Sequence, residues 1–129
     1  NFGCAEAYLS GRGFERRAHA RLGDSIGTGQ RIEEKARAGD GTLLPLFEEY
    51  AELLAVAIHN FIVLYAPRVV ILAGSFAHAA DLYLPQAEKH LEKLLMRRRH
   101  GVDFMPKLMV SKLENRSGLL GGAYVALNS

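Results

Sequence analysis

Two side chains close to the start of the sequence could take part in chemistry. Cys4 is the only cysteine of the 129 residues, and Glu6 follows it two positions later. A thiolate is a ligand for zinc, and a carboxylate accepts hydrogen bonds from hydroxyl groups such as those of a sugar. One cysteine can form neither an internal disulfide nor a multi-cysteine metal site. Taken alone, the local pattern favours a small buried cysteine and a glutamate in the first turn of a helix.

Two glycine-containing segments could approach a ligand closely. Ala73-Gly74-Ser75 follows a run of β-branched residues and precedes a predicted helix. Small residues there allow a ligand near the backbone, and a helix N-terminus favours a phosphate. Residues 117–123 contain three glycines, which permit close helix packing or the approach of a nucleotide base. An ordinary tight turn and ordinary helix packing are the alternatives at the two places.

Composition excludes several classes of protein. Lys and Arg total 16 and Asp and Glu total 14, so the formal net charge of +2 is too small to coat a polyanion by bulk charge. Hydrophobic residues make up 49%, which is typical of folded domains rather than of disorder. The longest apolar stretch, residues 53–66, is shorter than the ~20 residues that span a bilayer. With one cysteine and no signal-peptide pattern, the sequence favours a cytoplasmic protein without membrane contact.

The first forty residues predict two helices around a loop. Residues 5–22 are expected to be helical, with a break near Gly11 and Gly13. Three glycines within residues 23–29 indicate a loop, and residues 30–38 form a short charged helix. None of the five histidines of the chain stands three or four positions from another, so no metalloprotease-like spacing exists.

The clearest element is a long amphipathic helix over residues 43–65. Apolar residues recur at the i, i+3, i+4, i+7 spacing of one helix face, and Thr42 is a plausible N-cap. Glu48, Glu49 and Glu52 lie off this stripe. The outer face becomes apolar toward the C-terminal end, so we expect this helix to be covered on more than one side. Pro67 ends it.

The second half of the sequence alternates strands and helices. Residues 69–73 predict a strand covered on both faces, because the run is apolar without alternation. A helix is expected from Leu82 or Pro85 to Arg98, a second strand over residues 107–113 and a last helix over residues 117–127. This order predicts an α/β fold with parallel strands. Since two strands make a poor sheet, either strands are missed here or the rest of the sheet lies outside these residues.

Three segments, taken in this order, resemble the ROK family (repressors, open reading frames and sugar kinases). They are residues 3–11 (GCAEAYLSG), residues 67–75 (PRVVILAGS) and residues 117–123 (SGLLGGA). The run EAYLSGRGFE, residues 6–15, looks most like bacterial N-acetylglucosamine kinases and next like glucokinases. The resemblance implies that residues 1–129 are the C-terminal part of a sugar kinase domain of the actin-like ATPase fold, mostly helical with a few parallel strands, whose N-terminal lobe is absent.

The family resemblance also implies roles for individual residues. Cys4 matches one ligand of a structural zinc whose other ligands lie upstream, and Glu6 matches the carboxylate that contacts the sugar. Ala73, Gly74 and Ser75 stand where the family usually has three glycines near the adenosine of ATP. The implied cofactors are ATP and Mg²⁺, and the implied partners are a sugar and a second copy of the protein. No catalytic residue is expected within these 129 residues, because the family's catalytic aspartate lies upstream.

Two other functions stay open from the sequence. Some members of the family are transcriptional repressors that keep the sugar and zinc residues and bind nucleic acid through an added helix-turn-helix. A helical interaction module without a ligand is the third hypothesis. The kinase-like run at residues 6–15 favours an ATP-dependent hexose or N-acetylhexosamine kinase over the other two.

Overall fold

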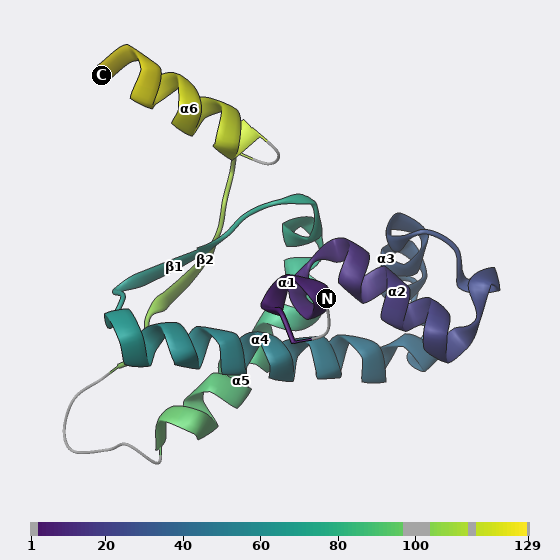
Figure 1. Cartoon of the computed structure of the whole chain (residues 1–129). Helices are drawn as coiled ribbons and strands as arrows, with labels where there is room; N and C mark the ends of the chain where they lie inside the picture. Colours follow the sequence, from purple (N-terminus) through teal and green to yellow (C-terminus); the bar gives the residue numbers. More distant parts are fainter. Residues whose placement is uncertain (1–2, 97–103, 114–115, 129) are drawn as a thin grey trace.

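The computed structural model describes residues 3–96, 104–113 and 116–128. Four helices come first: α1 (Ala5–Leu9), α2 (Gly11–Leu22), α3 (Gly29–Arg37) and the long α4 (Leu44–Tyr65). Strand β1 (Val69–Leu72), helix α5 (Ala80–Met96), strand β2 (Lys107–Val110) and helix α6 (Ser117–Asn128) follow. Short 3₁₀ turns, η1 (Asp24–Ile26), η2 (Gly41–Leu43) and η3 (Ser75–Ala79), precede α3, α4 and α5. Figure 1 shows α4 and α5 packed together beneath the two strands, with α2 and α3 at one end and α1 over the middle of α4.

The predicted break in the first helix falls at Ser10. This residue has an extended backbone (φ −77°, ψ 156°) and its side chain accepts a hydrogen bond from the Gly13 amide over 3.0 Å, so Ser10 is the N-cap of α2. Gly11 and Gly13 lie inside α2 instead of interrupting it. The predicted loop at residues 23–29 contains η1, whose Ile26 is buried.

The structure differs from the predicted N-cap of the long helix α4 and from the predicted start of helix α5. Thr42 does not cap α4, whose N-cap residue is Leu43 without a side-chain hydrogen bond. Asp40 caps the preceding η2, where its carboxylate accepts from the Thr42 amide over 3.0 Å. Helix α5 begins at Ala80, before Leu82 and Pro85. Pro85 lies in the second turn and is exposed, so its ring points to solvent. The expected end of this helix at Arg98 lies outside the described residues.

The core is built between α4 and the elements that surround it. Its largest fully buried side chains are Phe14, Ile32, Leu43, Ile58 and Leu91. They come from α2, α3, η2, α4 and α5, so one core joins these five elements. The apolar stripe predicted for residues 43–65 supplies most of the buried residues of α4. At 22 residues α4 is the longest described helix, and none of the described helices is long and apolar enough to cross a membrane.

The two strands pair in parallel, as the α/β pattern predicts. Val69 stands opposite Lys107, and Leu72 stands opposite Val110. The expectation that the first strand is covered on both faces is wrong for the described residues: Val69 is 44% exposed and Ile71 is 62% exposed, whereas Val70 and Leu72 are partly buried. Only the face that carries Val70 and Leu72 packs against the core. The outer face of this sheet is therefore apolar and open.

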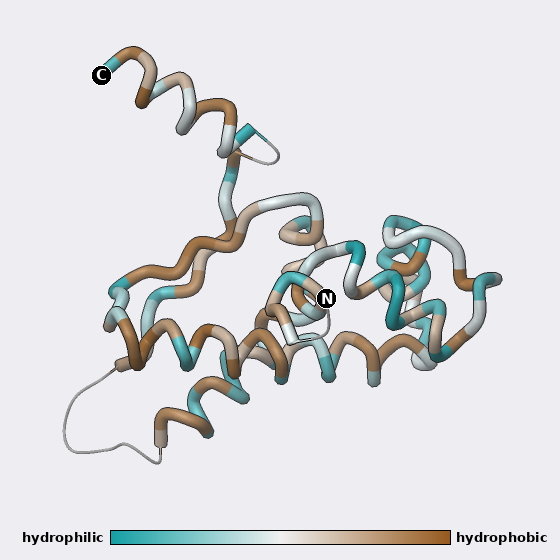
Figure 2. Tube along the Cα trace, in the orientation of Figure 1, coloured by the Kyte–Doolittle hydropathy of each residue, from teal (hydrophilic) through white to brown (hydrophobic). Residues whose placement is uncertain are grey.

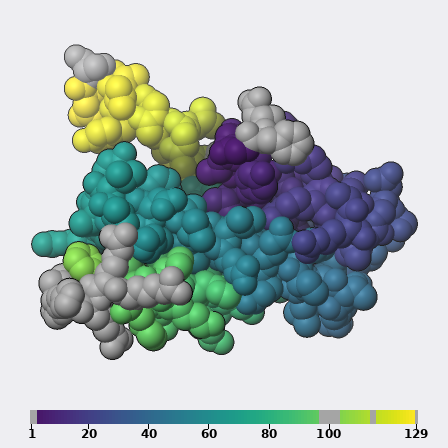
Figure 3. Space-filling view, turned by 60° about the horizontal axis from the view of Figure 1, so that its bottom comes forward, coloured from purple at the N-terminus to yellow at the C-terminus, as the bar shows by residue number. Residues whose placement is uncertain are grey.

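Helix α6 and the C-terminal half of α4 also expose apolar residues. Figures 2 and 3 show that α6 is rich in hydrophobic residues and protrudes from the body of the molecule. No residue of α6 is buried, and within the described residues a Cβ at Gly118, Gly121 or Gly122 would meet nothing within 4 Å. On α4, Phe61 is 51% exposed and Leu64 is 69% exposed. The expected cover on a second side of α4, and the expected packing of the glycines, are thus not found among these residues.

Candidate functional site

Glu6 lies in the first turn of α1 and is exposed to solvent. Its carboxylate makes no hydrogen bond or ion pair with the residues that the structure describes. Cys4 is the residue just before α1, with an extended backbone and a free, exposed thiol. The N-terminal end of α1 therefore presents one thiol and one carboxylate to solvent, and the carboxylate is free to accept hydrogen bonds from a ligand.

Helix α1 is held against α2 by a close backbone contact. Gly13 is buried, and a Cβ at this position would lie 2.4 Å from the carbonyl oxygen of Ala7. Real Cβ atoms are not found this close to a carbonyl oxygen, so only glycine allows α2 to approach α1 in this way. The sequence marks Gly13 as a helix breaker, but its role is to permit this contact.

The segment Ala73-Gly74-Ser75 forms the turn between β1 and η3. Gly74 has φ +98°, a conformation that side chains with a Cβ rarely adopt, and Ser75 begins η3. The one glycine that this chain keeps in the segment thus stands where the backbone needs it. All three residues are exposed.

Two cavities open on either side of this turn. A cavity of about 390 Å³ is lined by Ala73, Gly74 and Ser75 on one side and by Leu9 and Ser10 at the end of α1 on the other. A larger hollow of about 700 Å³ lies beyond Ser75 and Phe76, between the start of α2 and the start of α3. Neither cavity is lined by Cys4 or Glu6. The structure therefore brings the Ala73–Ser75 turn next to the C-terminal end of α1, while Glu6 lies at the N-terminal end of the same helix.

The larger cavity is polar on its α3 side. Arg37 and His78 line it, and the Arg37 guanidinium binds the Asp81 carboxylate over 2.7 and 3.2 Å. The same guanidinium donates to the His78 carbonyl oxygen over 2.9 Å. The hydrogen bond to Asp81 holds the pKa of Arg37 above its usual value. This network ties α3 to the turn that precedes α5 and so fixes one wall of the cavity.

A cluster of aromatic rings around Phe76 packs next to the Ala73–Ser75 turn. The Phe76 ring lies 4.7 Å from the Phe14 ring and 4.8 Å from the Tyr50 ring. Tyr83 stacks on Phe76 at 5.4 Å and donates from its hydroxyl to the Phe76 carbonyl oxygen over 3.2 Å. Burial raises the pKa of Tyr50 to about 12 and raises the pKa of Tyr83 as well, so both phenols stay protonated at neutral pH.

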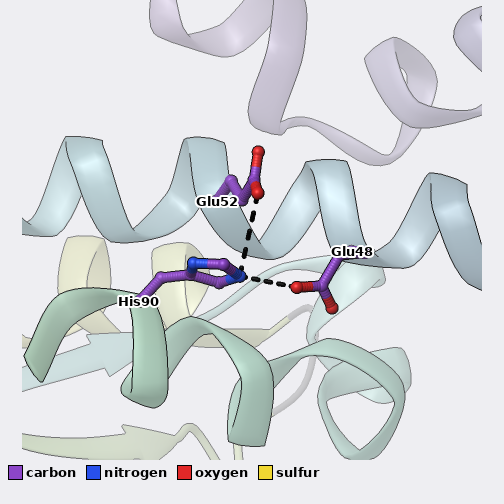
Figure 4. A group of neighbouring side chains, drawn as sticks. All are labelled: Glu48, Glu52 and His90. Atoms are coloured by element: carbon purple, nitrogen blue, oxygen red, sulfur yellow. Dashed lines mark hydrogen bonds and ion pairs between the residues drawn. The ribbon is translucent and has the colours of Figure 1, made fainter. Parts of the chain in front are cut away.

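A histidine and two glutamates meet between α4 and α5. His90 Nε2 lies 2.6 Å from Glu48 Oε1 and 4.0 Å from Glu52 Oε1 (Figure 4). Their candidate ligand atoms lie within 4.8 Å of one another, and both glutamates are exposed. The arrangement is an ion pair between two packed helices when the imidazole is protonated. The i, i+4 spacing of the glutamates is visible in the sequence, but only the packing of α5 on α4 brings His90 to them.

Residues 23–27 match the G-x-S-x-G sequence pattern of a nucleophile elbow, but they do not form its structure. The elbow requires a strand before the serine, and here α2 precedes it. His19 Nε2 lies 2.7 Å from the Gly27 carbonyl oxygen, and Nδ1 lies 3.2 Å from the Asp24 carboxylate. Both ring nitrogens hold the loop when the imidazole is protonated, and both are then donors to groups other than Ser25.

Cys4 does not belong to a complete metal site within the described residues. Glu48, Glu52 and His90 are the one group there whose side chains could jointly hold a metal ion. A structural zinc site needs four ligands, and Cys4 offers one. These residues alone therefore do not fit a structural zinc.

The sequence matches the family model described as ROK family over residues 1–129. An N-acetyl-D-glucosamine kinase of Pasteurella multocida (strain Pm70) is 32% identical over 130 aligned positions, which cover 99% of this chain and 40% of that protein. An N-acetyl-D-glucosamine kinase of Mannheimia succiniciproducens is also 32% identical and is covered to 40%. The chain thus spans about two fifths of the length of these curated relatives.

Solved structures of sugar kinases share this fold. A ROK family glucokinase from Streptomyces griseus, in complex with glucose and AMPPNP, superposes with a TM-score of 0.76 at 25% identity. This match covers 100% of the present chain and 46% of that one. A ROK hexokinase from Thermus thermophilus gives a TM-score of 0.78 at 25% identity, with 98% and 42% covered. The predominantly helical fold with two parallel strands corresponds to the C-terminal part of these structures.

Proposed function

Because the chain belongs to the ROK family, we propose that residues 1–129 are the C-terminal part of a sugar kinase domain. The complete domain would transfer the γ-phosphoryl group of ATP to the 6-hydroxyl of N-acetylglucosamine or glucose. The main support is the similarity to N-acetyl-D-glucosamine kinases over 98–99% of the chain, which includes the segment around Glu6. These relatives are named as kinases, which favours a kinase over a sugar-sensing repressor.

Glu6 is the residue that we propose to bind the sugar. Its exposed, unpartnered carboxylate can accept hydrogen bonds from two neighbouring hydroxyl groups at once. Hydrogen bonds from hydroxyls to a charged acceptor are stronger than those to a neutral one. The carboxylate would hold the sugar by hydroxyls away from the reacting 6-hydroxyl, and so would orient the substrate without taking part in the transfer.

The Ala73–Ser75 turn is the element that we propose to lie against the nucleotide. Gly74 lines the smaller cavity without a side chain, so a ligand there can approach its backbone. A Cβ built at Gly74 meets nothing within 4 Å. The two cavities beside the turn are of a size that accommodates a base and a ribose. The side chains of Ala73 and Ser75 narrow this approach relative to the three glycines of the family pattern, and we expect weaker nucleotide binding as a result.

The proposed transfer is a displacement at phosphorus. The 6-hydroxyl oxygen forms a bond to the γ-phosphorus, the bond to the β–γ bridging oxygen breaks, and ADP leaves. A general base takes the hydroxyl proton, and Mg²⁺ offsets the charge on the phosphate oxygens. We propose that an aspartate outside residues 1–129 is this base. The present chain would then contribute binding and orientation.

Three further assignments follow from the same proposal. Cys4 would supply one thiolate to a structural zinc whose remaining ligands come from outside these residues. The domain would assemble as a homo-oligomer and act in the cytoplasm. Its open apolar surfaces, the outer face of β1 and helix α6, would be covered in the complete protein.

The proposal is tested by sugar-dependent ADP release. The complete polypeptide should release ADP with N-acetylglucosamine or glucose, and Glu6→Gln should abolish the sugar interaction. Glu92→Gln, an exposed glutamate on α5, is the matched control and should retain activity. Residues 1–129 alone should release no ADP. Sugar-dependent ADP release by these residues alone, or full activity of Glu6→Gln, would contradict the proposal. Binding of sugar and DNA without ADP release would support the repressor.

A further inference from the structure

Helix α1 cannot hold its own position. It has five residues and no buried side chain, whereas isolated helices shorter than about 12 residues are marginal in water. Ser10 interrupts the chain between α1 and α2, so the direction of α1 is not set by a continuous helix. Since α1 carries Glu6, whatever fixes α1 also fixes this carboxylate.

Side chains from α2 and α4 satisfy the last three carbonyl groups of α1. Arg16 donates to the Ala7 carbonyl oxygen over 2.8 Å, and Arg17 donates to the Tyr8 carbonyl oxygen over 3.1 Å. The Tyr50 hydroxyl donates to the Leu9 carbonyl oxygen over 2.9 Å. These are the carbonyls that a helix end leaves without an intrahelical partner. Two guanidinium groups at this end also favour the helix by their charge.

Arg17 is the member of this group that links α1 to α4 by an ion pair, next to the hydroxyl of the buried Tyr50. Its second terminal nitrogen binds Glu49 Oε1 over 3.2 Å, and its side chain is only 17% exposed. Glu49 is held in turn by Arg21 over 2.7 Å. Glu49 and Tyr50 are neighbours on α4, so one turn of the central helix fixes α1 through both an ion pair and a hydroxyl.

We propose that Arg17, held by Glu49, is a positioning residue for Glu6. It sets the place of the carboxylate by fixing the C-terminal end of α1, and it does not itself touch the sugar. The inference rests on the proposed function for the part that concerns sugar. The part that concerns α1 does not depend on any ligand.

The experiment measures amide hydrogen exchange and sugar affinity in the complete polypeptide. Arg17→Met removes the donors and keeps the unbranched stem, Arg17→Lys retains the charge, and Arg31→Met on α3 is the control. Arg17→Met should speed exchange at residues 7–10 at least tenfold, leave residues 54–62 of α4 unchanged and weaken sugar binding about tenfold. Arg17→Lys should recover part of both losses. Arg31→Met should change neither quantity.

Two outcomes would overturn the proposal. Unchanged exchange at residues 7–10 in Arg17→Met would show that Arg17 does not fix α1. Equal acceleration in α1 and α4 would show a general loss of stability in Arg17→Met. Glu49→Gln, which keeps the Arg17 side chain but removes the charge that holds it, should then speed exchange in α1 alone, and its failure to do so would overturn the proposal. If the unsubstituted protein binds no sugar, the proposed function fails, whereas the exchange data still decide whether Arg17 fixes α1.

Discussion

The backbone at Gly13 of α2 lies directly against the carbonyl group of Ala7 of α1. An added Cβ would come within 2.4 Å of the Ala7 oxygen and 3.3 Å of the Glu6 oxygen. The contact fixes the distance between the helix that carries Glu6 and the helix that anchors in the core. Glycine is thus required at position 13 by space, since its backbone is helical.

Gly13→Ala should therefore destabilise the protein and displace α1. We expect a loss of about 2 kcal/mol or more in the free energy of unfolding, as overpacking against a backbone atom typically costs. Gly121→Ala on α6, where nothing lies within 4 Å, is the matched control and should be neutral or stabilising by about 0.5–1 kcal/mol. Urea denaturation followed by circular dichroism measures both. Equal stability of the two variants would contradict the contact.

Tyr50→Phe should remove one hydrogen bond and keep the aromatic cluster. The Leu9 carbonyl oxygen loses its donor over 2.9 Å, while the Tyr50 ring keeps its contacts with Phe76 and Tyr83. An unsatisfied partly buried carbonyl costs about 1–2 kcal/mol. Thermal denaturation of the variant should show this loss, and exchange at the Leu9 end of α1 should rise. If Tyr50→Phe lost as much stability as Tyr50→Ala, the hydroxyl and not the ring of Tyr50 would supply the stabilisation.

Stability should fall at alkaline pH because of the two buried tyrosines. Burial raises the pKa of Tyr50 to about 12 and raises that of Tyr83, whereas an unfolded tyrosine titrates near 10. The unfolded state therefore loses protons first, so the stabilisation is complete below pH 10 and is lost as the pH rises towards 12. The expected slope is about 1 kcal/mol per pH unit for each ring.

Urea denaturation between pH 8 and pH 11 measures this slope. In the variant with both Tyr50→Phe and Tyr83→Phe the curve should be flatter over the same range. A slope that is unchanged by these two substitutions would assign the alkaline loss to other groups.

Leu91→Ala should show that α5 is part of the core. Leu91 is fully buried, and truncating a buried leucine to alanine typically costs 2–5 kcal/mol. Leu44→Ala at the start of α4 is the control, because Leu44 is 68% exposed. We expect its effect to stay within about 0.5 kcal/mol. A loss for Leu91→Ala as small as that for Leu44→Ala, measured by urea denaturation, would contradict the place of α5 in the core.

Periodicity predicted the elements because most of them bury one regular face. The stripe on α4 and the helices on either side followed from spacing alone, and parallel pairing of the two strands followed from the order of elements. The N-cap was misplaced because the turn η2 precedes α4: Asp40 caps η2, and α4 begins after Leu43 without a side-chain cap. The start of α5 was misplaced because proline is expected in the first turn of a helix, whereas Pro85 lies inside α5, in its second turn.

The candidate site could be predicted only in part. The resemblance implied roles for Glu6 and the Ala73–Ser75 turn, which stay predictions, but spacing could not show that Leu9 and this turn line one cavity. The contacts of Arg17 and Tyr50 with α1 were missed as well, since they join residues that are 9 and 41 positions apart. The open face of β1 contradicts the prediction of a strand covered on both faces. An apolar run indicates that both faces favour burial, but it does not show which residues bury them.

The most direct test of the central claim is the affinity of the complete polypeptide for sugar with and without the Glu6 carboxylate. Isothermal titration should detect binding of N-acetylglucosamine or glucose to the unsubstituted protein. Glu6→Gln should weaken it at least about a hundredfold, as loss of a charged hydrogen-bonding group costs about 3 kcal/mol. Glu92→Gln should leave it unchanged. Equal affinity of the Glu6→Gln variant and the unsubstituted protein would contradict the assignment of α1 as the sugar-binding helix.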